Sequence, residues 1–348
     1  MTVRAPSLAE QVPPVLADWL IAALPEAVPP LEFTRIPGGF SMFTWRFADQ
    51  AGHGWVLRHR PPGTHQGRAH DTAREARAIG ALQDTAVPVP RLRAVGTDGD
   101  PLGLSCHVTD FVPGHVLADA EAATTLVTRQ ALTVASQGVV AALAALHAVD
   151  PAAVGLGDLA SRTDYVQRQF SRWSGVVDGL TFRDDTGVVA LFQTVRDELL
   201  RRMPSDHAGG IVHGDYRLGN AITGEDGTIR AILDWELVTL GDPLADVGMM
   251  AAFWDPPAEA MLGTRMPTSA PGAITIGEAL EHYARLSGTD LAGIAFYQAF
   301  AGWRLAATGL RSWVRYESGA MGEAYDTSKF ITAATAWLDY ARQLLAGR

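Results

Sequence analysis

Two stretches are the most informative in this sequence: Ile-Val-His-Gly-Asp-Tyr-Arg-Leu-Gly-Asn at residues 211–220 and Ile-Leu-Asp-Trp-Glu at residues 232–236. The apolar pair that opens the first motif predicts a short buried strand, which delivers the polar residues after it to a loop. An Asp-Gly turn between the two motifs predicts a hairpin that carries the chain back. We therefore expect the side chains of Asp215, Asn220 and Asp234 to lie close together at one end of the hairpin.

These three oxygen-bearing side chains suit phosphoryl transfer. A carboxylate can accept the proton of an attacking hydroxyl group, and oxygen ligands can hold the Mg²⁺ that bridges the phosphates of ATP. Mg²⁺ usually takes one or two carboxylates plus phosphate oxygens. Taken alone, the spacing His-x-Asp-x-x-x-x-Asn also occurs in ordinary loops, where Asp and Asn serve turns and caps. His213 has two possible roles. It could be a neutral ring that packs against the loop and hydrogen-bonds to it, or it could take part in the chemistry.

The two motifs resemble those of the aminoglycoside phosphotransferase superfamily, which has a protein-kinase-like fold. The resemblance runs from about Phe33 to the C-terminal helices. It points to the branch that occurs as a kinase-like segment fused to acyl-CoA dehydrogenase domains, although no dehydrogenase domain follows in this sequence. The motifs that support this branch are Leu57-Arg58, Pro61-Pro62, Ala69-His70-Asp71, Arg74-Glu75, Pro88-Val89-Pro90 and Gly241-Asp242-Pro243-Leu244-Ala245-Asp246.

The resemblance implies an α+β fold of two lobes. Residues 1–112 would form a small N-lobe with an N-terminal helix, an antiparallel sheet and one key helix. Residues 113–348 would form a mostly helical C-lobe, which carries the catalytic loop and the metal-binding hairpin. By the same resemblance, Asp215 would be the catalytic base, and Asn220 and Asp234 would be the metal ligands.

Arg217 and Glu236 flank these groups. By the resemblance, Arg217 occupies the position where protein kinases carry a Lys that neutralises the transferred phosphate; a solvated loop charge is the equal alternative. Asp234 is followed by Trp235-Glu236 rather than by Phe-Gly, which predicts no mobile activation switch. Glu236 is expected to reach a metal through water or to face the substrate.

By the resemblance, Arg58 is the candidate for the phosphate-binding role that protein kinases give to a strand-borne Lys. Lys329, the only Lys in the chain, lies too late in the sequence for that role. The segment 55–58 reads as a strand, and a guanidinium group can hold a phosphate with two parallel N–H bonds. Glu75, on an expected helix over residues 71–82, would orient Arg58 through an ion pair. The alternative is a surface Arg at a strand end and a solvated Glu.

Two N-lobe segments are expected to bind the nucleotide. The first is a Gly-Gly turn between strands, where backbone amides could approach a phosphate closely; such a turn is also an ordinary hairpin feature. The second is the hinge that follows the last strand, whose backbone would grip adenine; this assignment rests on order along the chain. The residues assigned to these segments are Gly38, Gly39, Ser41, Asp110, Phe111 and Val112.

The remainder of the chain reads as helical. Expected helices cover residues 7–24, 123–147, 161–173, 187–203, 276–286, 290–311 and 326–345. Asp246, one turn into a further helix, is expected to hold the backbone of the catalytic loop, with an ordinary surface Asp as the alternative. The C-terminal helices are rich in aromatic residues and have no acidic excess, which disfavours a polycationic acceptor. Trp254, Tyr297 and Arg304 are the candidates for substrate contact, with core packing or an ion-paired face as the alternatives.

Composition bounds the remaining possibilities. The 348 residues, 47% hydrophobic and 19% charged, indicate a folded protein with a large core. The net charge of −10 argues against a nucleic-acid partner. The single cysteine, Cys106, excludes an internal disulfide framework. The N-terminus lacks a signal-peptide pattern and the apolar runs are too short to span a bilayer, so we expect a cytoplasmic monomer or homodimer without a membrane partner.

Together these patterns predict a phosphotransferase that uses ATP and Mg²⁺ to phosphorylate a hydroxyl group of a small molecule. The branch resemblance suggests a hydroxyacyl-CoA-like compound or another apolar alcohol as the acceptor. One alternative is a phosphotransferase for a macrolide- or aminoglycoside-type antibiotic. The other is a catalytically silent, nucleotide-binding kinase-like protein; the intact Asp215, Asn220 and Asp234 favour an active enzyme.

Overall fold

The computed structural model describes residues 14–36, 42–59, 71–98, 103, 105–160, 165–180, 186–204, 209–254, 263–317 and 326–347. Its contacts divide the chain into two compact units. The sheet unit comprises Met1–Asp84, Val89–Pro113 and Asp234–Leu237, and the helical unit comprises Thr85–Pro88, Gly114–Leu233 and Val238–Arg348. The segment Asp234–Leu237 was predicted within the C-lobe. It groups with the sheet unit because it packs against the helix of that unit.

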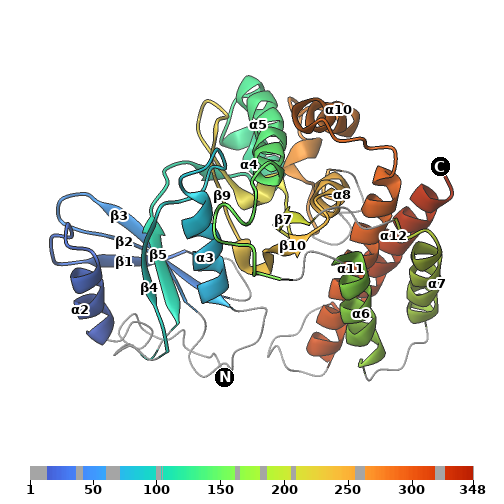
Figure 1. Ribbon diagram of the computed structural model, residues 1–348, viewed down its shortest axis with the longest axis horizontal. Coiled ribbons are helices and arrows are strands. Elements are labelled where there is room, and N and C mark those ends of the chain that lie inside the picture. Colours follow the sequence, from blue (N-terminus) through green and yellow to red (C-terminus); the bar gives the residue numbers. More distant parts are fainter. Residues whose placement is uncertain are drawn as a thin grey trace. The chain divides into compact units, whose positions relative to one another are not determined.

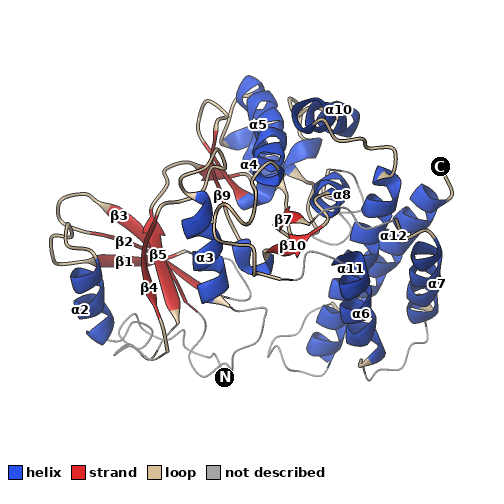
Figure 2. Ribbon diagram, in the orientation of Figure 1, coloured by secondary structure: helices blue, strands red, loops and turns tan. Residues whose placement is uncertain are grey.

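The sheet unit is built on five antiparallel strands (Figures 1 and 2). They are β1 (Glu32–Arg35), β2 (Phe43–Ala48), β3 (Gly54–His59), β4 (Leu92–Gly96) and β5 (Cys106–Asp110), in the order β1-β2-β3-β5-β4. Arg58 on β3 lies opposite Thr44 on β2 and His107 on β5. The position of this arginine is therefore fixed by strands on both sides.

Two helices cover the two faces of this sheet. Helix α2 (Pro14–Ala23) buries Leu16 and Leu20 in a cluster with the sheet residues Trp45, Phe47, Trp55, Leu57, Cys106 and Val108. Helix α3 (Thr72–Leu82) packs against β4 and β5. Because side chains alternate along a strand, Leu57 on the α2 face leaves Arg58 on the α3 face.

The expected start of α3 is confirmed to within one residue. The carboxylate of Asp71 accepts a hydrogen bond of 3.0 Å from the backbone N–H of Arg74, as an N-cap residue does. The cap sets where the helix begins and therefore which residues face the sheet. Glu75 falls on the buried side, one turn into the helix.

The helical unit contains eight described α-helices (Figure 2). They are α4 (Ala120–Thr125), α5 (Arg129–His147), α6 (Tyr165–Asp178), α7 (Val188–Arg201), α8 (Leu244–Ala252), α10 (Ile276–Ser287), α11 (Ile294–Glu317) and α12 (Ser328–Leu345). The single helix predicted over residues 123–147 is two helices. The chain breaks there because the Thr128 side chain accepts a hydrogen bond from Ala131 N–H and caps α5.

Helices α5 and α11 form much of the core of this unit. Contrary to the expectation that the apolar runs are too short, helix α5 is apolar and long enough to cross a membrane by length and composition alone, although more than half of it is buried inside the structure. Helix α11 packs against α8 and α12. A side chain at Gly248 on α8 would collide with the backbone of Tyr297, so glycine permits the close approach of α8 and α11.

Short strands frame the loop that follows Val212. Strand β7 (Gly210–Val212) pairs with β10 (Thr239–Gly241), and β8 (Ala221–Thr223) pairs with β9 (Ile229–Ile232) and with β6 (His115–Val116). The 3₁₀ turn η2 (Leu218–Asn220) leads from the loop into β8. The predicted strand, loop and hairpin are therefore all present in one unit.

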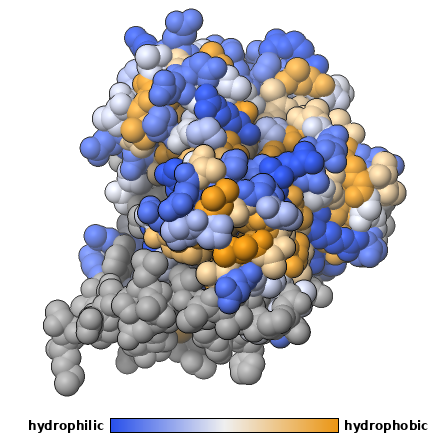
Figure 3. All heavy atoms as spheres, turned by 90° about the vertical axis from the view of Figure 1, so that its left-hand side faces the viewer, coloured by the Kyte–Doolittle hydropathy of each residue, from blue (hydrophilic) through white to orange (hydrophobic). Residues whose placement is uncertain are grey.

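Hydrophobic side chains at the described surface are dispersed. In the sheet unit, Val28 and Val95 are the large hydrophobic residues with exposed side chains. On the face that Figure 3 shows, hydrophilic and hydrophobic residues are interspersed among those that are coloured. Single exposed apolar residues are normal on protein surfaces, so the functional argument depends on the polar clusters.

Leu20 offers a direct test of the α2–sheet packing. Its side chain is fully buried, so Leu20→Ala should lower the free energy of unfolding by about 2–5 kcal/mol. Leu286→Ala, the same change at a side chain that is half exposed, is the matched control and should cost less than about 1 kcal/mol. Urea unfolding curves of both variants measure this, and equal losses would contradict the packing described.

Candidate active site

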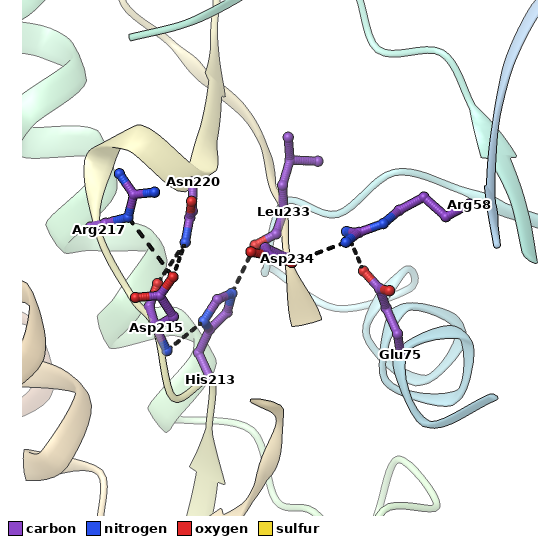
Figure 4. Close-up of polar contacts among 8 residues, drawn as sticks. All are labelled: Arg58, Glu75, His213, Asp215, Arg217, Asn220, Leu233 and Asp234. Carbon is purple, nitrogen blue, oxygen red and sulfur yellow. Dashed lines mark hydrogen bonds and ion pairs between the residues drawn. The ribbon is translucent and has the colours of Figure 1, made fainter. Parts of the chain in front are cut away.

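The loop between β7 and β8, which was predicted to be the catalytic loop, brings Asp215 and Asn220 together. The amide nitrogen Nδ2 of Asn220 donates to the Oδ2 of Asp215 at 2.9 Å and to its backbone oxygen at 2.8 Å (Figure 4). Both bonds use the nitrogen end of the amide, which leaves its oxygen as the end that a metal can bind. The pairing therefore fixes one predicted metal ligand against the predicted base.

His213 holds the loop from inside. Its ring is fully buried; Nδ1 lies 3.3 Å from the backbone N–H of Asp215, and Nε2 lies 2.9 Å from the backbone oxygen of Leu233. Since an N–H donates to Nδ1, the proton of the neutral ring belongs on Nε2, which donates to Leu233. This geometry supports the loop-bonding alternative for His213 rather than the chemical one. Leu233 is the residue directly before Asp234.

The carboxylate of Asp246 binds the backbone of the same loop, as the sequence analysis predicted. Its two carboxylate oxygens accept hydrogen bonds from the N–H groups of His213 (2.6 Å) and Gly214 (2.8 Å). Burial raises the pKa of Asp246, but hydrogen bonding and charge attraction from His147, with further help from His213 and Gly214, bring that pKa below its ordinary value. Asp246 is therefore an ionised, buried support for the loop.

His147 was missed by the sequence reasoning. Its Nε2 lies 3.6 Å from Asp246 Oδ2, and its Nδ1 forms a hydrogen bond of 2.7 Å with the hydroxyl of Tyr283. The signal was present, because His147 lies four residues after the buried Leu143 on the apolar face of α5. A polar ring at a core position indicates a buried polar partner.

Arg217 lies beside the base in the helical unit. Its Nε is 3.9 Å from Asp215 Oδ2, a distance for charge attraction rather than a hydrogen bond. Its guanidinium group lies 5.3 Å from the centre of the Phe253 ring and folds over Gly219, where a side chain would collide with it. Gly219 thus lets Arg217 stay close to the loop, while a quarter of the Arg217 side chain is exposed.

The sheet unit holds a second charged cluster, made of Arg58, Glu75 and Asp234. Nη1 of Arg58 donates to Oε1 of Glu75 at 2.7 Å, so the ion pair predicted from the sequence is present (Figure 4). Nη2 of Arg58 donates to Oδ1 of Asp234 at 3.1 Å, a bond that the sequence did not suggest. The arginine predicted to hold phosphate therefore also orients a predicted metal ligand.

Asp234 has an unusual backbone. Its φ of +65° is the only positive φ of a non-glycine residue in the parts of the chain that the structure describes. Asp and Asn tolerate this left-handed region better than other non-glycine residues, yet the conformation costs free energy. Such strain is common at ligand sites, and here it sets the direction of a carboxylate.

The charges of this cluster are strongly coupled. Burial raises the pKa of Glu75 to about 7, against the stabilising charge of Arg58, with Asp234 and Glu236 adding to the rise. The nearby carboxylates of Glu75 and Asp234 raise the pKa of Arg58 despite its burial. An anionic phosphate would thus meet a permanently charged guanidinium group.

The remaining nucleotide predictions are only partly described. Gly38, Gly39 and Ser41 lie outside the described residues. In the hinge, the Asp110 carboxylate binds Arg93 at 2.6 and 3.0 Å. The backbone N–H groups of Asp110 and Phe111 already donate within the sheet unit, to Arg91 and Gly54. Because these two N–H groups are already used, the predicted adenine contact now rests on the backbone of Val112, the next residue.

Two residues that were predicted to contact the substrate, Tyr297 and Arg304, are buried in the helical unit. Tyr297 is buried, and its hydroxyl donates to the Asp242 carboxylate, so it is part of the core of the helical unit. Arg304 is also buried, and its Nη2 donates to the backbone oxygen of Gly214 at 3.2 Å. Tyr297 was predicted because its region is rich in aromatic residues, and Arg304 because it is a cation on a helical face, but both residues are buried. Glu236 lies in η3 (Trp235–Leu237) of the sheet unit, near the Arg58 cluster.

Trp254 lines a hollow in the helical unit. Its lining is apolar or aromatic apart from Arg217, a threonine and backbone. The lining residues are Arg217, Leu218, Gly219, Met250, Phe253, Trp254, Met266, Pro267 and Thr268. None of these nine residues carries a carboxylate.

Within the described ranges, no group of three or more His, Cys, Asp or Glu side chains is placed to hold a metal ion by itself. Asn220 and Asp234 remain the predicted ligands, one in each unit. The donor set fits Mg²⁺, which is commonly held by one or two protein oxygens together with substrate phosphates. A metal site of this kind is completed by the nucleotide.

The architecture is that of a protein-kinase-like phosphotransferase, with an antiparallel sheet in the N-terminal region and a largely helical remainder. Residues 32–297 match the phosphotransferase enzyme family, and the chain belongs to that family. Its structure is similar to that of a candidate aminoglycoside phosphotransferase from Ralstonia eutropha JMP134, with 27% identity, a TM-score of 0.78, and coverage of 94% of this chain and 97% of that one. It also shares its fold with aminoglycoside phosphotransferase APH(4)-Ia in complex with ADP and hygromycin B, at 18% identity and a TM-score of 0.60, over 93% and 98% of the two chains.

The sequence relatives confirm the resemblance to the dehydrogenase-fused branch. Acyl-CoA dehydrogenase family member 10 of Mus musculus is 30% identical over 285 residues, which are 80% of this chain and 26% of that protein. The chain spans between 26% and 39% of the length of the curated relatives of this kind that it matches first. The similarity therefore concerns one segment of much larger proteins.

The raised pKa of Glu75 gives a stability test with a defined sign. A carboxyl group with a folded-state pKa of about 7 and an unfolded value of 4.5 stabilises the fold fully below pH 4.5, and this contribution is lost as the pH rises through 7. The free energy of unfolding of the wild type minus that of Glu75→Gln should therefore fall by up to about 3 kcal/mol between pH 5 and pH 8.

The difference between the two proteins is the quantity to measure, by urea unfolding without nucleotide. His107, whose pKa burial lowers to about 3, contributes to the pH dependence with the opposite sign in both proteins and cancels. A difference that stays constant from pH 5 to pH 8 would contradict the buried state described for Glu75.

Proposed function

We propose that this protein transfers the γ-phosphate of ATP, with Mg²⁺, to a hydroxyl group of a small molecule. The observation that carries the proposal is the pairing of Asp215 with Asn220 on a loop whose backbone is bonded to Asp246. Phosphoryl transfer needs an oriented carboxylate and an oxygen ligand close to it, and little other covalent chemistry from the protein. This pairing supplies both groups in a fixed geometry.

In this reaction Asp215 is the general base. Its carboxylate accepts the proton of the acceptor hydroxyl, the hydroxyl oxygen bonds to the γ-phosphorus, and the bond from that phosphorus to the bridging oxygen breaks to release ADP. Asn220 and Asp234 are the residues that would hold Mg²⁺, which supplies charge neutralisation at the phosphates when bound. Arg58, oriented by Glu75, would bind a phosphate of the nucleotide.

ATP is supported by two considerations. The guanidinium of Arg58 can hold phosphate oxygens as the kinase Lys does, and its charge is secured by two carboxylates. The fold neighbour APH(4)-Ia was studied with ADP bound. Carried over to this chain, that complex is a reason to test adenine nucleotides first.

The acceptor that fits best is a hydroxylated apolar molecule. The hollow beside Arg217 is lined by Met250, Phe253 and Trp254, and none of its described lining residues carries a carboxylate that could pair with a polycation. Relatives named for acyl-CoA dehydrogenases suggest a hydroxyacyl thioester as the first compound to try. Antibiotic alcohols, such as macrolides and aminoglycosides, are the comparison compounds.

Asp215→Asn tests the base. We expect kcat to fall by about 10²–10⁴-fold, because the amide cannot accept the hydroxyl proton, while the affinity for the nucleotide stays within a few fold. Asp178→Asn, the same change at an exposed residue at the end of α6, should leave kcat unchanged. ADP release with hydroxyacyl-CoA compounds, amino alcohols, sugars, macrolides and aminoglycosides measures both.

An Asp215→Asn protein as active as the wild type would remove the base assignment. A wild type that binds Mg-ATP tightly but phosphorylates no acceptor would instead indicate the silent, nucleotide-binding class.

Asp234→Asn tests the metal ligand without disturbing the backbone, because Asn also tolerates positive φ. We expect the Mg²⁺-dependent part of ATP affinity to fall by more than tenfold, since a neutral amide is a weaker ligand than a carboxylate. Calorimetric titration with ATP, with and without Mg²⁺, measures it. Unchanged Mg²⁺-dependent affinity would overturn the assignment of Asp234.

A further inference from the structure

Arg304 is a buried cation far from the catalytic loop in sequence. It lies in the middle of α11 with 6% of its surface exposed. Its Nη2 donates to the backbone oxygen of Gly214 at 3.2 Å, and its Nη1 is 3.5 Å from the hydroxyl of Tyr165. A side chain from the C-terminal half therefore reaches the residue directly before the base.

The burial of this guanidinium group is costly. The rings of Trp173 and Phe300 lie about 6 Å from it, which gives only weak cation–π attraction. Its Nε is buried and has no hydrogen-bond partner among the described residues. Arginine is seldom kept in a core at such a cost for packing alone, because an apolar side chain would fill the same space more favourably.

The bond to Gly214 completes a set of restraints on one short stretch of backbone. The N–H of Gly214 donates to Asp246 and its C=O accepts from Arg304, so opposite charges hold the two polar groups of this residue. Gly214 has a φ of +92°, which glycine adopts without strain. The next N–H, that of Asp215, donates to His213 Nδ1.

The peptide that joins Gly214 to Asp215 is consequently held at both ends. Arg304 binds its oxygen and His213 binds its N–H. The direction of this peptide sets where the Asp215 carboxylate points. Since transfer rates fall about 10²-fold when a reacting group is misplaced by about 1 Å, restraint of this peptide bears directly on turnover.

We propose that Arg304 is a positioning residue for phosphoryl transfer, acting through Gly214 on the direction of Asp215. The inference rests on the proposed function for its effect on rate, and on the hydrogen bond to Gly214 for its effect on the loop. It replaces the predicted role of Arg304 as a substrate contact.

The test compares Arg304→Met, which keeps the length of the side chain but removes its charge and its N–H groups, with Arg304→Lys. Arg202→Met is the matched control, because Nη1 of Arg202 also donates to a backbone oxygen of the helical unit, that of Leu345 at the end of α12, which belongs neither to the loop nor to the strands β7 and β10. Three readouts apply to each protein: steady-state kinetics, thermal unfolding, and amide hydrogen exchange of the peptide that covers residues 211–217.

For Arg304→Met we expect kcat to fall by about 10–100-fold with KM for ATP within about threefold, and exchange to accelerate in residues 211–217. Added guanidinium ion at millimolar concentration should restore part of kcat, and Arg304→Lys should retain more activity than the Met variant. Arg202→Met should keep kcat within about threefold and leave exchange in residues 211–217 unchanged.

A folded Arg304→Met protein with wild-type kcat and wild-type exchange in the loop would overturn the proposal, as would equal losses in Arg202→Met. If the Met variant does not fold, Arg304→Lys is compared with the wild type instead: kcat and exchange in residues 211–217 that both equal those of the wild type would contradict the proposal. Absence of transfer activity in the wild type would refute the proposed function instead, and hydrogen exchange would still decide whether Arg304 restrains the loop.

Discussion

The two hydrogen bonds from His213 and Gly214 to Asp246 are the constraint on which the catalytic loop depends. A buried carboxylate must be satisfied by several donors, and here the donors are backbone N–H groups of the loop itself. If the loop moved away, the Asp246 carboxylate would lose these two hydrogen bonds while still buried. Asn220, bonded to Asp215 from the end of the loop, extends this restraint to the base.

The sheet unit holds in place Arg58, the cation that we propose binds phosphate in the role that Lys has in protein kinases. Arginine is longer and planar, so it needs partners that fix its orientation as well as its charge. Glu75 and Asp234 bind its two terminal nitrogens separately. The strained backbone of Asp234 is a consequence, since it places that carboxylate within reach of Arg58.

Much of this arrangement could be predicted from the sequence. Strong local signals marked the elements around the site: the cap at Asp71, the Asp-Gly turn of the hairpin, and the spacing from Asp215 to Asn220. These three features depend on short-range geometry, which local sequence patterns report well. The ion pair of Arg58 with Glu75 was expected instead from the resemblance to protein kinases, whose strand-borne Lys pairs with a helical Glu.

The remaining features depended on contacts between distant segments. Arg304 and His147 lie on helices whose apolar pattern shows that they are buried but not which loop they meet. The bond of Arg58 to Asp234 spans 176 residues and comes from a tertiary arrangement that no local pattern encodes. The break between α4 and α5 was missed because Thr128 reads as one polar residue within a continuous helical pattern.

The most direct test of the central claim is a ³¹P NMR spectrum of the protein with ATP, Mg²⁺ and the acceptor panel. The account predicts that the γ-phosphate signal of ATP is replaced by that of a phosphate monoester on an acceptor hydroxyl, in an amount equal to the ADP formed. A spectrum that shows only inorganic phosphate, or ATP that stays intact with every acceptor, would contradict it.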